Sequence, residues 1–184
     1  QGDLNGSVDA FKNATLFDAN NSMAWSNLAY ALSQTGNKTE TLAAYDNALK
    51  INPNDTVTWM NKAEFFNQTG NYIGAIDAVD NVLASQENNS HALLFKGNMS
   101  MNLYRFSDAE EAYSRALELN PDDTTALLLK GSALFYQKKD QEALQLFDQL
   151  LDKEPGNDAA WIFKVAILHD LGRGEETVWI YQKA

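Results

Sequence analysis

Few residues in this 184-residue sequence have the chemistry of catalysis, and their spacing keeps them apart. The two histidines, His91 and His169, are separated by 78 residues, and neither belongs to a His-Glu-x-x-His zinc motif. The sequence also lacks the Gly-x-Ser-x-Gly nucleophile turn and the phosphate-binding Gly-x-x-x-x-Gly-Lys-Ser/Thr loop. We therefore expect no catalytic residue, no metal site and no cofactor, and we expect a protein that is not an enzyme.

Carboxylates are more numerous, but their pattern indicates solvent-exposed helices. The pairs Glu110-Glu111 and Glu175-Glu176 lie in predicted helices, where consecutive side chains point about 100° apart and cannot act on one substrate. The acidic turn at Asp122-Asp123 lacks the Gly and the distal Glu of a calcium-binding loop. Helix capping explains such turns better than metal binding.

Asparagine side chains offer a different chemistry, the attachment of glycans. The sequence Asn-x-Ser/Thr occurs eight times, always starting within the first hundred residues, whereas the frequencies of Asn, Ser and Thr predict about two occurrences. The candidates in expected loops are Asn20, Asn37, Asn54 and Asn88. Either repeat duplication in an Asn-rich chain produced this excess, or the protein is a secreted or cell-surface glycoprotein. The excess slightly favours an extracellular location, with the cytoplasm as the alternative.

The net charge narrows the classes of partner. Lys and Arg number 14 and Asp and Glu number 25, which gives a net charge of −11. Nucleic acids and anionic membrane surfaces require basic patches, so neither is expected as a partner. No apolar run approaches the ~18 residues of a membrane span, so we expect no direct membrane contact in this fragment. The absence of cysteine excludes disulfides and cysteine-based metal sites.

The elements that carry these residues recur with a period of 34 residues. Trp25, Trp59 and Trp161 are separated by 34 and 102 residues, and Leu93 and Leu127 occupy the intervening positions. In repeats numbered from 22, 56, 90, 124 and 158, position 8 holds Ala29, Ala63, Gly97, Gly131 and Val165, and position 24 holds Tyr45, Val79, Tyr113, Phe147 and Tyr181. Short side chains at position 8 allow two helices to approach to about 8 Å, and the bulky side chains fill the space beside that contact.

This pattern resembles the tetratricopeptide repeat (TPR) family over the whole chain. The resemblance implies an all-α fold, an α-solenoid in which stacked antiparallel helix pairs form a right-handed superhelix. It predicts the second helix of a truncated repeat at 1–21, four repeats at 22–55, 56–89, 90–123 and 124–157, and a repeat at 158–184 that lacks its end and a capping helix. Tyr104 and Lys138 depart from the pattern, because glycine marks the equivalent turn at Gly36, Gly70 and Gly172.

Capping residues and prolines predict where the helices begin and end. Asp55, Asn89, Asp123 and Asn157 are good caps for the first helix of a repeat. The second helix ends before Pro53, Pro121 or Pro155, because the residue before proline avoids the helical conformation. We predict helices near 22–35 and 38–51, recurring every 34 residues.

In the TPR family the first helix of each repeat forms the inner wall of a groove, and this resemblance supplies the candidate binding residues. The candidates in the first two repeats form a mostly uncharged, hydrogen-bonding wall: Asn27, Tyr30, Asn61 and Glu64. Those in the later repeats are mainly apolar: Leu94, Phe95, Asn98, Leu128, Leu129, Phe135, Ile162 and Phe163. The wall has no Lys or Arg at repeat positions 2, 5, 6 and 9, so we do not expect it to clamp the carboxylate of an acidic peptide tail.

Two interpretations of the apolar wall stay open. A following helix or repeat outside this fragment covers it, or it holds an amphipathic helix or an apolar peptide. In the second case, changing Leu128 and Phe163 to Lys is expected to abolish partner capture without unfolding the array.

The sequence as a whole predicts a non-catalytic scaffold that binds a protein or peptide of unknown identity. The first alternative is a structural or self-assembling repeat segment of a secreted or cell-surface glycoprotein. The second, less favoured, is the TPR targeting region of an enzyme whose catalytic domain lies outside this fragment. Because the terminal repeats lack polar caps, Phe11, Leu16, Trp179 and Tyr181 are expected to be partly exposed and to support self-association that depends on concentration.

Overall fold

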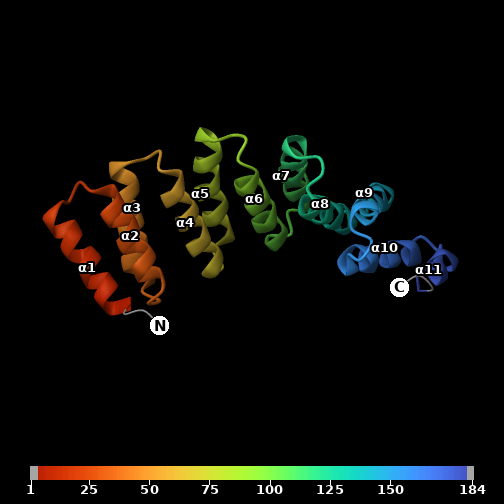
Figure 1. Cartoon of the computed structure of the whole chain (residues 1–184), viewed down its shortest axis with the longest axis horizontal. Coiled ribbons are helices and arrows are strands. Elements are labelled where there is room, and N and C mark those ends of the chain that lie inside the picture. Colours follow the sequence, from red (N-terminus) through yellow and green to blue (C-terminus); the bar gives the residue numbers. More distant parts are fainter. Residues whose placement is uncertain (1–3, 182–184) are drawn as a thin grey trace. The chain divides into compact units, whose positions relative to one another are not determined.

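The computed structural model describes the backbone of residues 4–181 and the side chains of residues 4–177. Within these ranges every regular element is an α-helix (Figure 1). The helices are α1 (Leu4–Phe17), α2 (Ser22–Ser33), α3 (Lys38–Ile51), α4 (Thr56–Gln68), α5 (Tyr72–Ser85), α6 (Ser90–Asn102), α7 (Phe106–Leu119), α8 (Thr124–Tyr136), α9 (Asp140–Lys153), α10 (Asp158–Asp170) and α11 (Gly174–Tyr181). The second helices from α3 to α9 have the predicted bounds, and each first helix ends one or two residues earlier than predicted.

The chain divides into two compact units, the N-terminal unit Gln1–Glu87 and the C-terminal unit Asn88–Ala184. In the N-terminal unit α2 packs against α1 and α3, and α4 packs against α3 and α5. Its core contains Val8, Leu28, Leu32, Tyr45 and Phe65. In the C-terminal unit the pairs α6–α7, α8–α9 and α10–α11 pack in sequence order. Each unit is thus a stack of antiparallel helix pairs whose apolar residues lie between neighbouring helices.

The predicted caps are present at the beginnings of the helices. The side chains of Asp55, Asn89, Asp123 and Asn157 accept hydrogen bonds from backbone N–H groups in the first turns of α4, α6, α8 and α10. Such caps satisfy N–H groups that have no partner within the helix. The periodic Asn and Asp residues of these turns therefore have a structural role.

The recurrent tryptophans also have a structural role. The indole N–H groups of Trp25, Trp59 and Trp161 donate hydrogen bonds to the carbonyl oxygens of Ala19, Pro53 and Pro155, at 2.9, 2.8 and 2.9 Å. In each case the acceptor lies six residues earlier, in the loop before the helix. The indole thereby fixes the loop to the helix that follows it.

Close approach explains the small residues at repeat position 8. A Cβ atom added to Gly97 would lie 2.3 Å from the ring of Tyr113, and one added to Gly131 would lie 2.7 Å from the ring of Phe147. Because Cβ atoms do not approach rings so closely, α6 and α8 require glycine where they meet α7 and α9. Ala29 and Ala63, at the same position of the N-terminal unit, are fully buried.

The turns within helix pairs use the left-handed backbone conformation. Gly36 and Gly70 have φ of +80° and +76°, and Tyr104 and Lys138 adopt φ of +58° and +61° at the equivalent positions. The departures noted in the sequence therefore preserve the turn, although a side chain in this conformation costs about 1–2 kcal/mol.

Candidate functional site

The N-terminal unit contains a pocket of about 320 Å³ between α2, α3 and α4. Its lining residues are Tyr30, Ser33, Gln34, Tyr45, Asn61, Glu64, Phe65 and Gln68. A volume of this size is at the lower end of the range of small-molecule sites, about 300–1,000 Å³. The pocket can therefore hold one side chain or a small organic group.

Helical spacing brings the lining residues together. Asn61, Glu64, Phe65 and Gln68 follow one another at intervals of three, one and three residues in α4, so they share one face of that helix. Tyr30 and Ser33 occupy the last turn of α2, and Gln34 is its C-cap residue. Tyr45, from α3, is 1% exposed and forms part of the buried wall.

Several polar groups of the pocket have no partner among the described residues. Among the side chains that the structure describes, none forms a hydrogen bond or an ion pair with Asn61, Glu64 or Gln68. Ser33 and Gln34 are paired locally, because Ser33 donates to the Tyr30 carbonyl at 2.7 Å and Gln34 donates to Ser33 Oγ at 3.1 Å. A carboxylate and two carboxamides are consequently available to a ligand.

The hydroxyl of Tyr45 stays protonated over the physiological range. Burial, with a further contribution from Tyr30, raises the pKa of Tyr45 to about 12, and a hydrogen bond with Ser33 opposes this shift only in part. The buried wall of the pocket is therefore neutral, and Glu64 supplies the one carboxyl group in the lining.

Three of the four candidates that the sequence indicated for this unit line the pocket, namely Tyr30, Asn61 and Glu64. The fourth, Asn27, is exposed on α2 but is not among the lining residues. Two lining residues were not predicted from the sequence. The repeat pattern predicted only a packing role for Tyr45, and it made no prediction for Phe65. Position 24 signals a bulky residue in every repeat, but no periodic signal marks which of these residues borders a pocket.

The candidates of the C-terminal unit lie mostly within packed surfaces. Phe95 is 8% exposed and therefore offers little surface to a ligand, which departs from the expectation that it lies on an open wall. Leu94 and Leu129 pack against one buried cluster, and Leu128, Phe135 and Phe163 pack against another. Ile162 is 69% exposed, and Asn98 is exposed but accepts a hydrogen bond from the Tyr113 hydroxyl at 2.7 Å.

Aromatic rings join these surfaces in the C-terminal unit. Phe163 stacks on Phe147 with ring centres 5.3 Å apart and meets Phe135 edge to face at 5.4 Å. Tyr136 contacts Phe135 and stacks on Phe106 at 5.1 Å. Lysine at position 163 would place a charge among these rings. The substitution proposed from the sequence therefore does not separate lost binding from lost stability.

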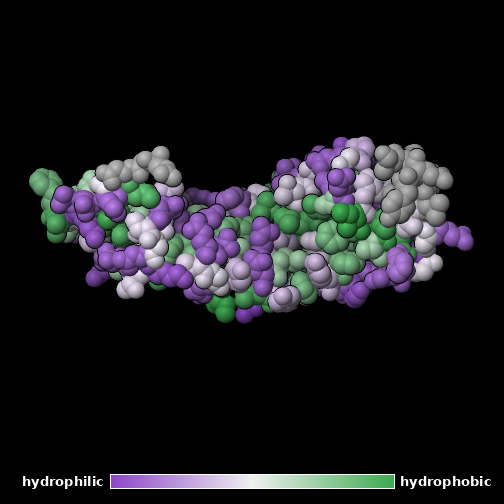
Figure 2. All heavy atoms as spheres, turned by 90° about the horizontal axis from the view of Figure 1, so that it is seen from below, coloured by the Kyte–Doolittle hydropathy of each residue, from purple (hydrophilic) through white to green (hydrophobic). Residues whose placement is uncertain are grey.

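Hydrophobic residues gather on the face of the C-terminal unit that is drawn in Figure 2, whereas hydrophilic residues are more frequent on that face of the N-terminal unit. The exposed hydrophobic residues of the C-terminal unit include Ile162 and Tyr136, at 69% and 51%.

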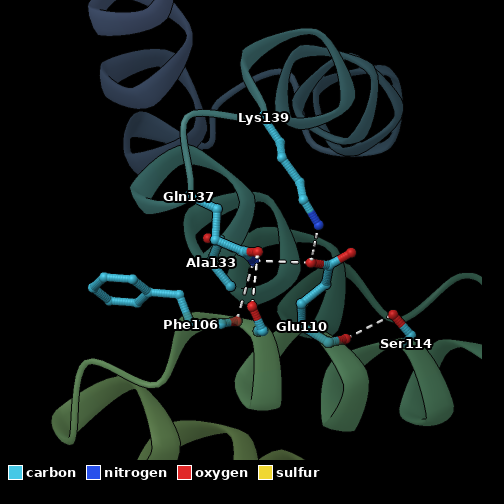
Figure 3. Close-up of polar contacts among 7 residues, drawn as sticks. Phe106, Glu110, Ser114, Ala133, Gln137 and Lys139 are labelled. Carbon is cyan, nitrogen blue, oxygen red and sulfur yellow. Dashed lines mark hydrogen bonds and ion pairs between the residues drawn. The ribbon is translucent and has the colours of Figure 1, made fainter.

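A polar cluster in the C-terminal unit contrasts with the pocket, because its members are paired (Figure 3). Gln137 donates to the carboxylate of Glu110 at 2.8 Å and to the carbonyl oxygen of Phe106 at 3.2 Å, and Lys139 pairs with Glu110 at 2.7 Å. Burial acts to raise the pKa of Glu110, but the hydrogen bonds from Lys139 and Gln137 outweigh it and lower that pKa. The cluster links α7 to the α8–α9 turn and is structural.

The four asparagines proposed as glycosylation sites are exposed in turns. Asn37 already has a structural role, since its side chain accepts from the N–H of Glu40 and donates to the Glu40 carboxylate at 2.7 Å. Asn20, Asn54 and Asn88 lie in the loops before α2, α4 and α6. Their exposure is compatible with modification.

Among the described residues, no group of three or more His, Cys, Asp or Glu side chains is placed to hold a metal ion. No helix of the described part of the chain has the length and apolar character needed to cross a membrane.

Comparison with protein families gives matches to tetratricopeptide repeat models at residues 22–55 and 100–160. Among solved structures, YrrB, described as a TPR protein with an unusual peptide-binding site, is 23% identical with a TM-score of 0.78, and the match covers 96% of this chain and 91% of that one. MamA is 18% identical with a TM-score of 0.79 and 88% coverage of both chains. The second TPR domain of human RPAP3, in complex with the HSP70 peptide SGPTIEEVD, is 23% identical with a TM-score of 0.58, covering 61% of this chain and 93% of that one. No curated protein sequence gives a significant match.

Proposed function

Because the chain belongs to the tetratricopeptide repeat family, we propose that it is a non-catalytic scaffold that binds a peptide or a peptide segment of a protein. The observation that carries this proposal is the pocket of the N-terminal unit, where Asn61, Glu64 and Gln68 have no partner among the described residues. Polar groups that the fold itself does not use are available for recognition, and hydrogen bonds to them would fix the position of a ligand.

The first helices of the repeats supply the proposed contact surface in each unit. In the N-terminal unit it comprises Asn27, Tyr30, Asn61 and Glu64. In the C-terminal unit it comprises Leu94, Asn98, Leu128, Leu129 and Ile162, with Phe135 and Phe163 contributing ring edges. Polar residues would orient a ligand at the first surface, and apolar contact would predominate at the second.

The proposed ligand differs from the acidic tail in the RPAP3 complex. That peptide ends in Glu-Glu-Val-Asp, and its recognition calls for cationic groups. The pocket of this chain has a carboxylate and no Lys or Arg among its lining residues. An acidic tail would therefore meet repulsion at Glu64.

A selection experiment tests the proposal. The immobilised chain is exposed to a displayed library of random twelve-residue peptides, and each enriched peptide is titrated by fluorescence anisotropy. We expect some enriched peptides to lose at least about tenfold in affinity for Asn61→Phe, which inserts a ring into the pocket, because steric exclusion removes the contacts made there.

Phe17→Ser is the matched control, because Phe17 is 96% exposed and lies outside the pocket. It should leave the affinity of the selected peptides unchanged. A library that yields no specific peptide would contradict the proposed function. Enriched peptides that all bind Asn61→Phe as tightly as the unchanged chain would exclude the pocket as their site.

Self-association is a second candidate, favoured by exposed apolar residues at the end of α1. Leu16 and Phe17 are 82% and 96% exposed, while Phe11 is partly buried and packs against the core of the N-terminal unit. The side chains of Trp179 and Tyr181, also expected to contribute, lie outside the described residues. Light scattering over a range of concentrations should show a rising mean mass that Phe17→Ser reduces. A constant monomeric mass would contradict self-association.

A further inference from the structure

The pocket of the N-terminal unit has a chemistry more specific than general peptide recognition. Its polar lining consists of one carboxylate, from Glu64, three carboxamides, from Gln34, Asn61 and Gln68, and hydroxyl groups. Of the aromatic residues in its lining, Tyr30 is 56% exposed, whereas Tyr45 and Phe65 are buried. No lining residue is cationic, so the pocket combines the Glu64 carboxylate with the exposed ring of Tyr30.

The net charge of the surrounding unit also favours a cationic ligand over an anionic one. Residues 1–87 contain ten acidic and four basic residues, which gives this unit a net charge of −6. The cation nearest to Glu64 in sequence, Lys62, is already engaged, because it pairs with Asp46 at 2.7 Å and lies over the ring of Trp59. Thus none of the described cationic residues forms an ion pair with Glu64.

Each alternative class of ligand group fits this lining less well. An anion would be repelled by Glu64 and by the unit as a whole. A purely apolar group would cover Asn61, Glu64 and Gln68 without pairing them, which incurs their desolvation cost. A cation on an apolar stem would meet the carboxylate and the carboxamide oxygens with its charge, while its stem and charge contact the exposed ring of Tyr30.

We propose that this pocket binds the side chain of a lysine or arginine residue in the peptide ligand. The inference rests on the proposed function, because it assigns one residue class to a peptide bound on the N-terminal unit. The equivalent region of the C-terminal unit has no such site, since phenylalanines 135 and 163 occupy the positions of Ser33 and Asn61 three repeats later. The selectivity for a basic residue therefore belongs to the N-terminal unit.

The test uses two small probes in place of an unidentified peptide. Nα-acetyl-lysine amide and Nα-acetyl-norleucine amide share a four-carbon stem, and only the first carries an ammonium group. Each is titrated into the ¹⁵N-labelled full chain and followed by NMR. We expect the lysine probe to shift the resonances of Asn61, Glu64 and Gln68 and to bind about three- to tenfold more tightly than the norleucine probe, as expected for one partly exposed ion pair with a cation–π contact.

Glu64→Gln removes the charge while retaining the shape of the side chain. It should reduce binding of the lysine probe to the level of the norleucine probe, whereas Glu111→Gln, an equal change of charge on the exposed surface of the C-terminal unit, should have no effect. Equal binding of both probes, lysine-probe shifts confined to other acidic residues, or unchanged binding to Glu64→Gln would overturn the inference. A peptide selection that fails while the probes behave as expected would contradict only the proposed function. Selected peptides that bind without any basic residue would contradict only this inference.

Discussion

The same three repeat positions form an open pocket in the N-terminal unit and a packed stack of rings in the C-terminal unit. Ser33, Tyr45 and Asn61 border the pocket. Phenylalanines stand 102 residues later at positions 135, 147 and 163, where their ring centres lie 5.3–5.4 Å apart in successive contacts. Side-chain volume at positions 12 and 6 therefore decides whether this part of a helix-pair stack is available to a ligand or belongs to the core.

The comparison also separates two uses of polar residues. In the C-terminal unit, Glu110 is paired with Gln137 and Lys139 and joins successive helices. In the N-terminal unit, Glu64 has no partner among the described residues. A paired carboxylate stabilises the fold, whereas an unpaired one on a pocket wall is available for recognition.

The largest expected effect comes from breaking the ring stack. Phe147 is fully buried, and Phe147→Ala should lower the free energy of unfolding by about 3–5 kcal/mol, because it removes a buried ring and leaves a cavity beside Gly131 and Phe163. Urea denaturation followed by circular dichroism measures this loss.

The matched control is Phe17→Ala, which removes a ring that is 96% exposed. Its effect should remain within about 0.5 kcal/mol. If Phe147→Ala were no more destabilising than this control, the rings would not form a packed core, and the contrast between the two units would fail.

Periodicity predicted the helices well because it records what every repeat needs. Small residues at position 8, caps such as Asp55 and the loop-binding Trp59 recur for reasons of packing and hydrogen bonding, so their spacing determines helix bounds. The pocket was predicted only in part. Tyr30, Asn61 and Glu64 were found through a family pattern, but the pocket depends on the combined volumes of side chains from three helices.

The burial of Phe95 also shows that repeat position alone does not predict whether a residue is exposed. It shares repeat position 6 with Asn61, which borders the pocket, yet it is 8% exposed. Repeat position specifies the direction of a side chain from its helix. It does not specify how far the neighbouring side chains extend. The extent to which they cover a residue determines whether that residue contacts a ligand or the core.

A smaller effect should appear at alkaline pH, because the pocket and the ring stack differ at position 24. Burial raises the pKa of Tyr45 to about 12, above the value of about 10 expected in the unfolded chain, whereas the equivalent Phe147 has no proton to lose. Below pH 10 the hydroxyl is protonated in both states and stability does not depend on it. As the pH rises from 10 towards 12, only the unfolded chain loses this proton. Ionisation therefore favours the unfolded chain, and the free energy of unfolding falls progressively, by about 2 kcal/mol in total.

Tyr45→Phe tests this difference, because it gives the pocket the residue that the ring stack has at the same repeat position. Burial also raises the pKa of Tyr113, so the variant should retain part of the alkaline dependence and lose the part that Tyr45 supplies. The measurement is the free energy of unfolding in urea at pH 7 and at several values between 9.5 and 11.5, for the unchanged chain and the variant. Parallel curves for the two proteins would show that the Tyr45 hydroxyl ionises equally in the folded and unfolded states, which would contradict its place in the buried wall of the pocket.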